Sequence, residues 1–296
     1  MIPNAEGKRW TLRHGDFRET LALCEGAADL VLTSPPYCDA RTYGMGVSWG
    51  MDEYAALGDA VFAALRPGGH ALINVDAPVR EWRPGFGTER GFHPWRLMLD
   101  WAERVGFRVP DRLAFGRQGI PGAFPRGFRN DWEPLLWFQK PGGDAYLDKR
   151  AISTTAFAPE RVHQKVDGRN DSRDTRTYRE GSFTCERVYP GTLWGYGNVG
   201  THALGDAGHP ASWPYKLAED IVRCFCPPGG LACDPFVGAG TSAVAAFEHG
   251  RRFIGGDLGS RPADAERGLD AVPWVEVARR VLDARARQGK LFGSDL

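Results

Sequence analysis

The run Thr33-Ser34-Pro35-Pro36-Tyr37 combines residue types that could bind and activate an amino group. Two consecutive prolines fix φ and remove two N–H donors, so the loop offers carbonyl acceptors and few donors. The exocyclic nitrogen of cytosine or adenine is a poor nucleophile because its lone pair is delocalised into the ring. Hydrogen bonds from its N–H groups to the Ser34 hydroxyl and the Pro35 carbonyl would expose that lone pair to a sulfonium methyl. Tyr37 offers a flat face for a base taken out of a duplex, although Pro-Pro-Tyr in isolation is more typical of an ordinary turn with a packed tyrosine.

A second chemical signal, LACDPFVGAGT, runs from Leu231 to Thr241 and predicts a strand, a Gly-rich turn and a helix start. Gly238 and Gly240 allow a ligand to approach the backbone, and the following helix presents free N–H groups. Asp234, directly before the turn, suits an ammonium group and would repel a pyrophosphate. Asp257, seventeen residues beyond Gly240, could accept both hydroxyls of a ribose. The same glycine spacing also satisfies a dinucleotide fingerprint, so an NAD-dependent dehydrogenase is an alternative.

Alternating strands and helices must position these two motifs. Apolar runs predict strands at 28–33, 70–75, 109–115, 133–139, 230–233 and 252–257, and helices at 52–65, 94–105, 214–225 and 241–249. Such alternation indicates a largely parallel α/β sheet with ligands beyond the C-terminal strand ends, where both motifs lie. From 141 to about 208 the sequence shows neither the 3.6-residue period of a helix nor the two-residue period of a strand. This predicts either a disordered loop or a recognition insert.

Composition limits the function classes. The chain has 296 residues, with 37 Lys and Arg against 37 Asp and Glu, so any nucleic-acid surface has to be local. Two windows are basic: 80–129 has ten Arg against five acids, and 149–179 has eight Lys and Arg against four acids. Six cysteines without a C-x-x-C pair argue against a zinc ribbon and are expected to be mostly small buried hydrophobes, and no metal site is expected. No apolar span or signal peptide is evident, so we expect a cytoplasmic protein with no membrane association.

The motif order resembles the β-class amino-methyltransferases of bacterial and phage DNA modification systems. In that family the target-site motif precedes the cofactor motif, a circularly permuted order that this chain shares. His14-Gly15-Asp16-Phe17 is similar to the family's G-D element, whose Asp contacts the cofactor adenine. His209-Pro210-Ala211-Ser212-Trp213-Pro214 is similar to its H-P-x-x-x-P element, which lines the methionine end, and Asp257 matches its ribose-binding acid.

The resemblance implies a Rossmann-like methyltransferase fold that binds S-adenosyl-L-methionine. It implies a mostly parallel seven-stranded sheet with helices on both faces, a catalytic core at 1–140 and 209–296, and a small target-recognition insert at 141–208. The target base would lie against Ser34, Pro35, Pro36 and Tyr37. The cofactor would lie against Asp16, Phe17, Thr33, His209, Ser212, Asp234, Pro235, Phe236, Gly238, Gly240, Thr241, Asp257 and Leu258.

The insert's basic window supplies the expected contacts to double-stranded DNA. These are Lys149, Arg150, Lys165, Arg169, Arg173, Arg176 and Arg179, with aromatic neighbours Tyr178, Phe183, Tyr189, Trp194 and Tyr196. A cognate restriction endonuclease and a homodimer are compatible with the resemblance, but the sequence decides neither. The segment 260–273 interrupts the family's usual passage from the ribose-binding acid into a helix.

Ser34 bears on the product. Relatives with S-P-P-Y mostly methylate N4 of cytosine, and those with D-P-P-Y mostly N6 of adenine. The resemblance therefore favours N4-cytosine, with N6-adenine as the alternative. A 5-methylcytosine enzyme would need a Cys directly after Pro, whereas Cys38 follows Tyr37. A non-catalytic DNA-binding regulator is a more distant alternative.

Overall fold

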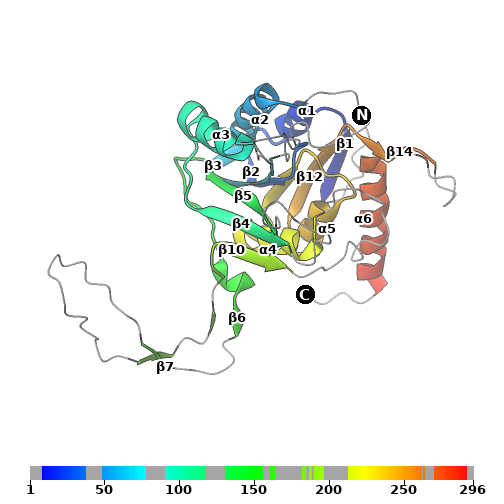
Figure 1. Cartoon of the computed structure of the whole chain (residues 1–296). Helices are drawn as coiled ribbons and strands as arrows, with labels where there is room; N and C mark the ends of the chain where they lie inside the picture. The colour runs from blue at the N-terminus through cyan, green and yellow to red at the C-terminus, as the bar shows by residue number, and fades with distance from the viewer. Residues whose placement is uncertain are drawn as a thin grey trace, which may run out of the picture.

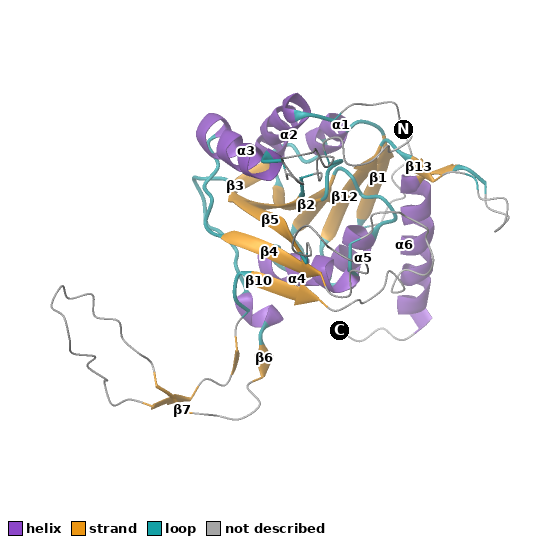
Figure 2. Ribbon diagram, in the orientation of Figure 1, coloured by secondary structure: helices purple, strands orange, loops and turns teal. Residues whose placement is uncertain are grey.

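An eight-stranded sheet forms the centre of the molecule, in the order β1-β12-β11-β2-β3-β5-β4-β10 (Figures 1 and 2). This computed structural model describes residues 9–37, 49–77, 91–117, 131–155, 161–163, 182–184, 187–188, 190–196, 213–261, 263 and 270–291. β5 runs antiparallel to both of its neighbours, and the other adjacent pairs are parallel. The strands are β1 (Trp10–His14), β2 (Ala28–Thr33), β3 (Leu65–Asn74), β4 (Arg112–Arg117), β5 (Trp132–Gln139), β10 (Leu193–Tyr196), β11 (Leu231–Asp234) and β12 (Arg252–Asp257).

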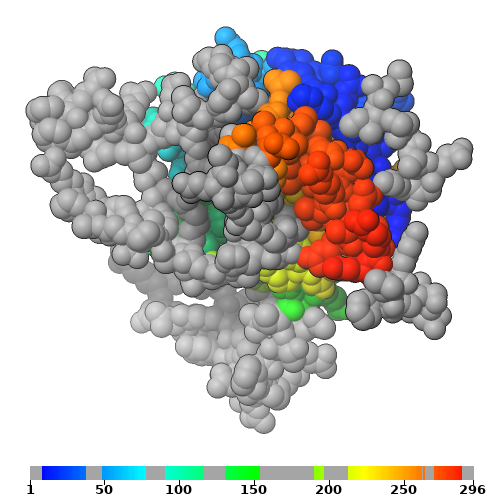
Figure 3. All heavy atoms as spheres, turned by 90° about the vertical axis from the view of Figure 1, so that its right-hand side faces the viewer, coloured from blue at the N-terminus to red at the C-terminus, as the bar shows by residue number. Residues whose placement is uncertain are grey.

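Helices cover both faces of the sheet. Side chains alternate along β2: Leu30 and Leu32 pack into the core under α4, α5 and α6, whereas Val31 packs into the core under α1, α2 and α3. Figure 3 shows α6 at the surface beside the first elements of the chain. The helices are α1 (Phe17–Ala22), α2 (Met51–Ala64), α3 (His93–Asp100) continuing as a π-helical turn (Trp101–Val105), a 3-10 turn (Lys149–Ile152), α4 (Tyr215–Phe225), α5 (Thr241–Glu248) and α6 (Trp274–Leu291).

The predicted α/β architecture is confirmed, with eight strands in the sheet instead of seven. The predicted strands at 28–33 and 252–257 coincide with β2 and β12, and the others match to within a few residues, except that β3 begins five residues earlier. β1, α1, β10 and α6 were not predicted. α1 has six residues and β1 five, too short for a clear period.

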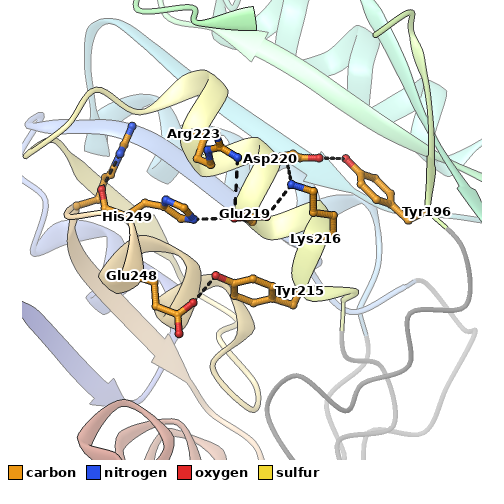
Figure 4. Close-up of polar contacts among 9 residues, drawn as sticks. Tyr196, Tyr215, Lys216, Glu219, Asp220, Arg223, Glu248 and His249 are labelled. Carbon is orange, nitrogen blue, oxygen red and sulfur yellow. Dashed lines mark hydrogen bonds and ion pairs between the residues drawn. The ribbon is translucent and has the colours of Figure 1, made fainter. Parts of the chain in front are cut away.

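The additional strand, β10, lies at the edge of the sheet beside β4. Its sequence, LWGY, contains a glycine and an exposed Leu193, so it lacks the apolar alternation of a buried strand. Tertiary contacts hold it in place: the ring of Trp194 stacks on Phe225, and the Tyr196 hydroxyl donates a 3.0 Å hydrogen bond to Asp220 of α4. Figure 4 shows that Asp220 also meets Lys216 on the same helix.

Short two-stranded pairs complete the described structure. They are β6 (Thr154–Thr155) with β9 (Arg187–Val188), β7 (Arg161–His163) with β8 (Ser182–Thr184), and β13 (Ser260–Arg261) with β14 (Val272–Pro273). The last pair brackets the segment that interrupts the passage from β12 to α6. Cys24, Cys224, Cys226 and Cys233 are buried free thiols, as predicted, and Cys38 and Cys185 lie outside the described residues. Within the described ranges, no helix has the length and apolarity needed to cross a membrane.

Candidate active site

The two predicted motifs meet at one edge of the sheet. β2 and β11 are parallel neighbours, so the loops that follow Thr33 and Asp234 leave the sheet side by side. The Thr33 hydroxyl donates a hydrogen bond of 2.6 Å to the carboxylate of Asp234. Tyr37 and Phe236, from the two loops, pack against the same hydrophobic core. The predicted convergence of segments about two hundred positions apart is therefore confirmed.

Asp234 is buried, with 5 % of its surface exposed, and receives several hydrogen bonds. One carboxylate oxygen accepts from Thr33 and from the Phe236 backbone N–H at 3.0 Å, and the other accepts from the Ser242 hydroxyl at 2.5 Å. Burial raises the pKa of Asp234 to about 6, while the three hydrogen bonds oppose that rise. The carboxylate thus supports the loop and keeps further acceptor capacity for an ammonium group.

Asp257 anchors the Gly-rich turn. Its two carboxylate oxygens accept hydrogen bonds from the Gly238 N–H at 2.9 Å and from the Gly259 N–H at 2.7 Å. Burial raises the pKa of Asp257. Gly240 has φ +96°, and a Cβ there would lie 2.9 Å from the Cβ of Ala278, so this position favours glycine for both conformation and space. Leu258, which follows Asp257, is exposed.

The predicted Asp16 and Phe17 lie at the same edge, because the Gly15 N–H bonds to the Asp257 carbonyl at 3.1 Å. Asp16 caps α1 by accepting from the Arg18 backbone N–H at 2.8 Å. Phe17 is buried, and its ring centroid lies 5.7 Å from that of Phe236. Trp49 meets both rings edge-on, so the three aromatic rings form a cluster at this edge.

The Ser34–Tyr37 loop is held by side chains from two other elements. The Tyr54 hydroxyl of α2 donates to the Pro36 carbonyl at 3.0 Å, so that carbonyl is already engaged. The Tyr37 hydroxyl lies 2.9 Å from a carboxylate oxygen of Glu133 and 3.5 Å from the Ser34 hydroxyl. Burial, then the charge of Glu133, raises the pKa of Tyr37, which therefore keeps its proton.

Several residues that complete this edge were not predicted from the sequence. These are Trp49, Tyr54, Asn74, Glu133, Trp213 as a hydrogen-bond donor, and Ser242. Only Glu133, an acid opening an apolar strand, and Asn74, a polar residue closing one, carried a sequence signal.

Other predicted residues lie elsewhere. Lys149 and Arg150 are exposed on the 3-10 turn, whose preceding residue Asp148 bonds to the Cys224 carbonyl near the C-terminal end of α4. Trp213, at the opposite end of that helix, is the residue that reaches the active-site edge. Outside the described residues are His209, Ser212, Lys165, Arg169, Arg173, Arg176, Arg179, Tyr178 and Tyr189.

A family model described as DNA methylase matches residues 28–264, which span the whole of this edge except β1 and α1. The chain belongs to this DNA methylase family. The sheet edge with its two motifs is accordingly the candidate active site of a DNA methylase. The assignment decides against the dehydrogenase alternative.

Curated relatives align with most of the methylase. The orphan methyltransferase M.BamHII of Bacillus amyloliquefaciens is 26% identical over 239 residues, covering 80% of this chain and 86% of the relative. The DNA adenine methyltransferase YhdJ of Escherichia coli is 22% identical over 294 residues, covering 96% of this chain and 93% of YhdJ.

Solved structures share the methylase fold. The PvuII cytosine-N4-specific DNA methyltransferase superposes with a TM-score of 0.60 at 18% identity, covering 93% of each chain. TTHA0409 from Thermus thermophilus, in complex with S-adenosyl-L-methionine, superposes with a TM-score of 0.54 at 25% identity, covering 91% of this chain and 92% of TTHA0409. The relatives and structures thus include proteins named for adenine and for cytosine.

Proposed function

We propose that this methylase transfers the methyl group of S-adenosyl-L-methionine to N4 of a cytosine flipped out of double-stranded DNA. The observation that carries the proposal is the Thr33–Asp234 hydrogen bond, which holds the amine-binding loop against the cofactor loop. Methyl transfer needs the sulfonium and the amine in contact, and only adjacent loops can provide this.

The residues present fit the cofactor. The buried carboxylate of Asp234 could bind the ammonium group of the cofactor. Asp257 lies at the end of the neighbouring strand, where the ribose hydroxyls could reach it. α5 begins at Thr241 and presents the first N–H groups of a helix toward the same edge. The bound cofactor supplies an electrophilic methyl on a cationic sulfur. The neighbouring carboxylates favour a cation and disfavour a pyrophosphate.

The amine would bind in the Ser34–Tyr37 loop. The Ser34 oxygen and the Pro35 carbonyl would each accept one N–H of the exocyclic amine, which localises the nitrogen lone pair for attack on the methyl group. Since Tyr54 occupies the Pro36 carbonyl, Pro35 and Ser34 supply these contacts in our proposal. The face of Tyr37 would stack on the flipped base.

Ser34 supports cytosine as the base, since S-P-P-Y members of the family mostly act on N4 of cytosine. N6 of adenine is the alternative, because YhdJ, which aligns with nearly the full chain, is named an adenine methyltransferase. We further propose that the segment 141–208 carries target recognition, between core segments 1–140 and 209–296. Within that segment, β10 belongs to the central sheet.

Mass spectrometry of nucleosides tests this proposal. DNA treated with the protein and isotopically labelled S-adenosyl-L-methionine should contain labelled N4-methylcytosine. Labelled N6-methyladenine would overturn the base assignment, and no labelled nucleoside from any DNA tested would favour a non-catalytic regulator. A parallel reaction with Ser34→Ala controls for methylation by a contaminating enzyme.

A further inference from the structure

A polar cluster surrounds the Tyr37 hydroxyl, and its Asn74 and Glu133 side chains are buried. It consists of Tyr37, Asn74 at the end of β3, and Glu133 near the start of β5, with Trp213 before α4. β5 is antiparallel to β3, so its first residues reach the same edge as the last residues of β2 and β3. The sheet topology, and not sequence proximity, therefore brings Glu133 to the amine-binding loop.

The donors and acceptors in this cluster favour one set of hydrogen-bond directions. The Asn74 amide nitrogen donates to the Pro134 carbonyl at 3.0 Å, so its oxygen faces Trp213, whose ring N–H donates to it at 3.0 Å. That same oxygen lies 3.4 Å from the Tyr37 hydroxyl, whereas the Glu133 carboxylate lies at 2.9 Å. Both groups can only accept from Tyr37, and the single Tyr37 proton favours Glu133 because that acceptor is closer and negatively charged.

The orientation of the Tyr37 hydroxyl also influences the orientation of the Ser34 hydroxyl. With its proton committed to Glu133, the Tyr37 oxygen offers lone pairs to the Ser34 hydroxyl 3.5 Å away. When Ser34 donates to Tyr37, its own lone pairs are left for other donors. An exocyclic amine presents N–H groups, which require such an acceptor.

We propose that Glu133 is a positioning residue that sets this chain of hydrogen bonds, so that Ser34 faces the target amine as an acceptor. The inference rests on the proposed function, because it assigns Ser34 the amine. Glu133 touches neither the base nor the cofactor in this scheme, and acts only through Tyr37. Glu133 is buried at the sheet edge, with 7 % of its surface exposed.

Steady-state kinetics with a double-mutant cycle tests the proposal. Glu133→Met keeps the size of the side chain and removes the acceptor, and we expect kcat to fall about tenfold with little change in KM for DNA or in the cofactor Kd. Glu133→Gln retains an acceptor oxygen and should recover most of the lost rate. In a Tyr37→Phe background, Glu133→Met should cause no further loss, because the hydroxyl through which it acts is already absent.

Asp29→Asn is the matched control. Asp29 is a carboxylate of similar burial on β2, away from the active-site edge, where it accepts from the Leu231 N–H at 2.8 Å. This variant should lower the melting temperature and leave kcat unchanged. Equal losses from Glu133→Met in both backgrounds, or an unchanged kcat, would overturn the role of Glu133. If Glu133→Met does not fold, Glu133→Leu, which also lacks an acceptor, compared in the two backgrounds gives the same decision.

The two proposals fail differently. Absence of N4-methylcytosine with the wild-type protein contradicts the proposed function. A wild-type protein that makes N4-methylcytosine, together with additive effects in the cycle, contradicts only the inference about Glu133.

Discussion

The Thr33 hydroxyl donates a 2.6 Å hydrogen bond to the carboxylate of Asp234, 201 positions along the chain. Thr33 ends the strand before the Ser34–Tyr37 loop, and Asp234 ends the strand before the Gly-rich turn. The hydrogen bond stabilises the ionised form of the buried Asp234 carboxylate. The charge state of Asp234 therefore depends on a residue that adjoins the other loop.

Cofactor binding should depend on the protonation of Asp234, whose pKa burial raises to about 6. Above this pH the carboxylate attracts the ammonium of the cofactor. Below it, the free protein holds a neutral acid that must lose its proton on binding, so the Kd should rise by up to about tenfold per pH unit. Calorimetry across about pH 5 to 8 measures this. Asp234→Asn should bind weakly with a flat profile, and Thr33→Val should move the midpoint to higher pH. A flat wild-type profile would contradict the role of Asp234.

Ser34→Ala should lower kcat by about tenfold or more, because the amine loses one of its two acceptors in the transition state. The cofactor Kd should change little, since Ser34 belongs to the other loop. Single-turnover methylation together with calorimetry separates the two effects. Loss of cofactor binding with an intact fold would show that Ser34 has a different role.

Asp257→Ala should raise the cofactor Kd by about tenfold or more. The substitution removes the expected ribose acceptor and also frees the N–H groups of Gly238 and Gly259, which loosens the turn. Calorimetry at a pH well above 6 avoids interference from Asp234. An unchanged Kd would remove Asp257 from the site.

His70 should make the fold sensitive to acid. The ring is buried between the Trp137 N–H, which donates to its Nδ1 at 3.1 Å, and the Tyr146 carbonyl, 2.9 Å from its Nε2. Burial lowers the pKa of His70 to about 4, so the unfolded state takes up a proton as the pH falls below about 6.5 while the folded state does not. The contribution of the neutral His70 ring to the free energy of unfolding is therefore fully present above about pH 6.5. It is lost as the pH falls from about 6.5 to about 4, and the loss amounts to roughly 3 kcal/mol.

Urea unfolding of the wild type and of His70→Gln over this pH range measures the difference. Asp234 contributes the opposite slope between about pH 4 and 6, because its folded-state pKa is raised, so the comparison with the variant isolates His70. Parallel curves for wild type and His70→Gln would contradict the prediction.

Lys149→Ala and Arg150→Ala should each weaken DNA binding to all sequences alike and reduce the salt dependence of binding by about one charge. Both residues lie near the end of α4 away from the active-site edge, so we expect phosphate contacts and no change in the base methylated. Fluorescence anisotropy at several salt concentrations gives the slope. Arg280→Ala, at an exposed site on α6, is the control. If Lys149→Ala or Arg150→Ala has the same salt dependence as the wild type, that residue does not contact a phosphate.

The sequence by itself determined the α/β class, and it predicted the two loops that meet at the candidate site. It could do so because buried parallel strands are continuous apolar runs, and because Pro-Pro and Gly-x-Gly turns impose their own local geometry. These signals are local, and they predicted Ser34, Asp234 and Gly240 as site residues without reference to the rest of the chain.

Only the tertiary structure decided which side chains support these loops. The sequence of β10 has no strand signal, and its place depends on pairing with β4 and on the contact of Tyr196 with Asp220. Glu133 reaches Tyr37 only because β5 runs antiparallel to β3, and strand direction is not written in the residues of a single strand. A hydrogen bond between groups about a hundred positions apart follows from sheet order and register, which the whole core sets by burying its apolar faces together.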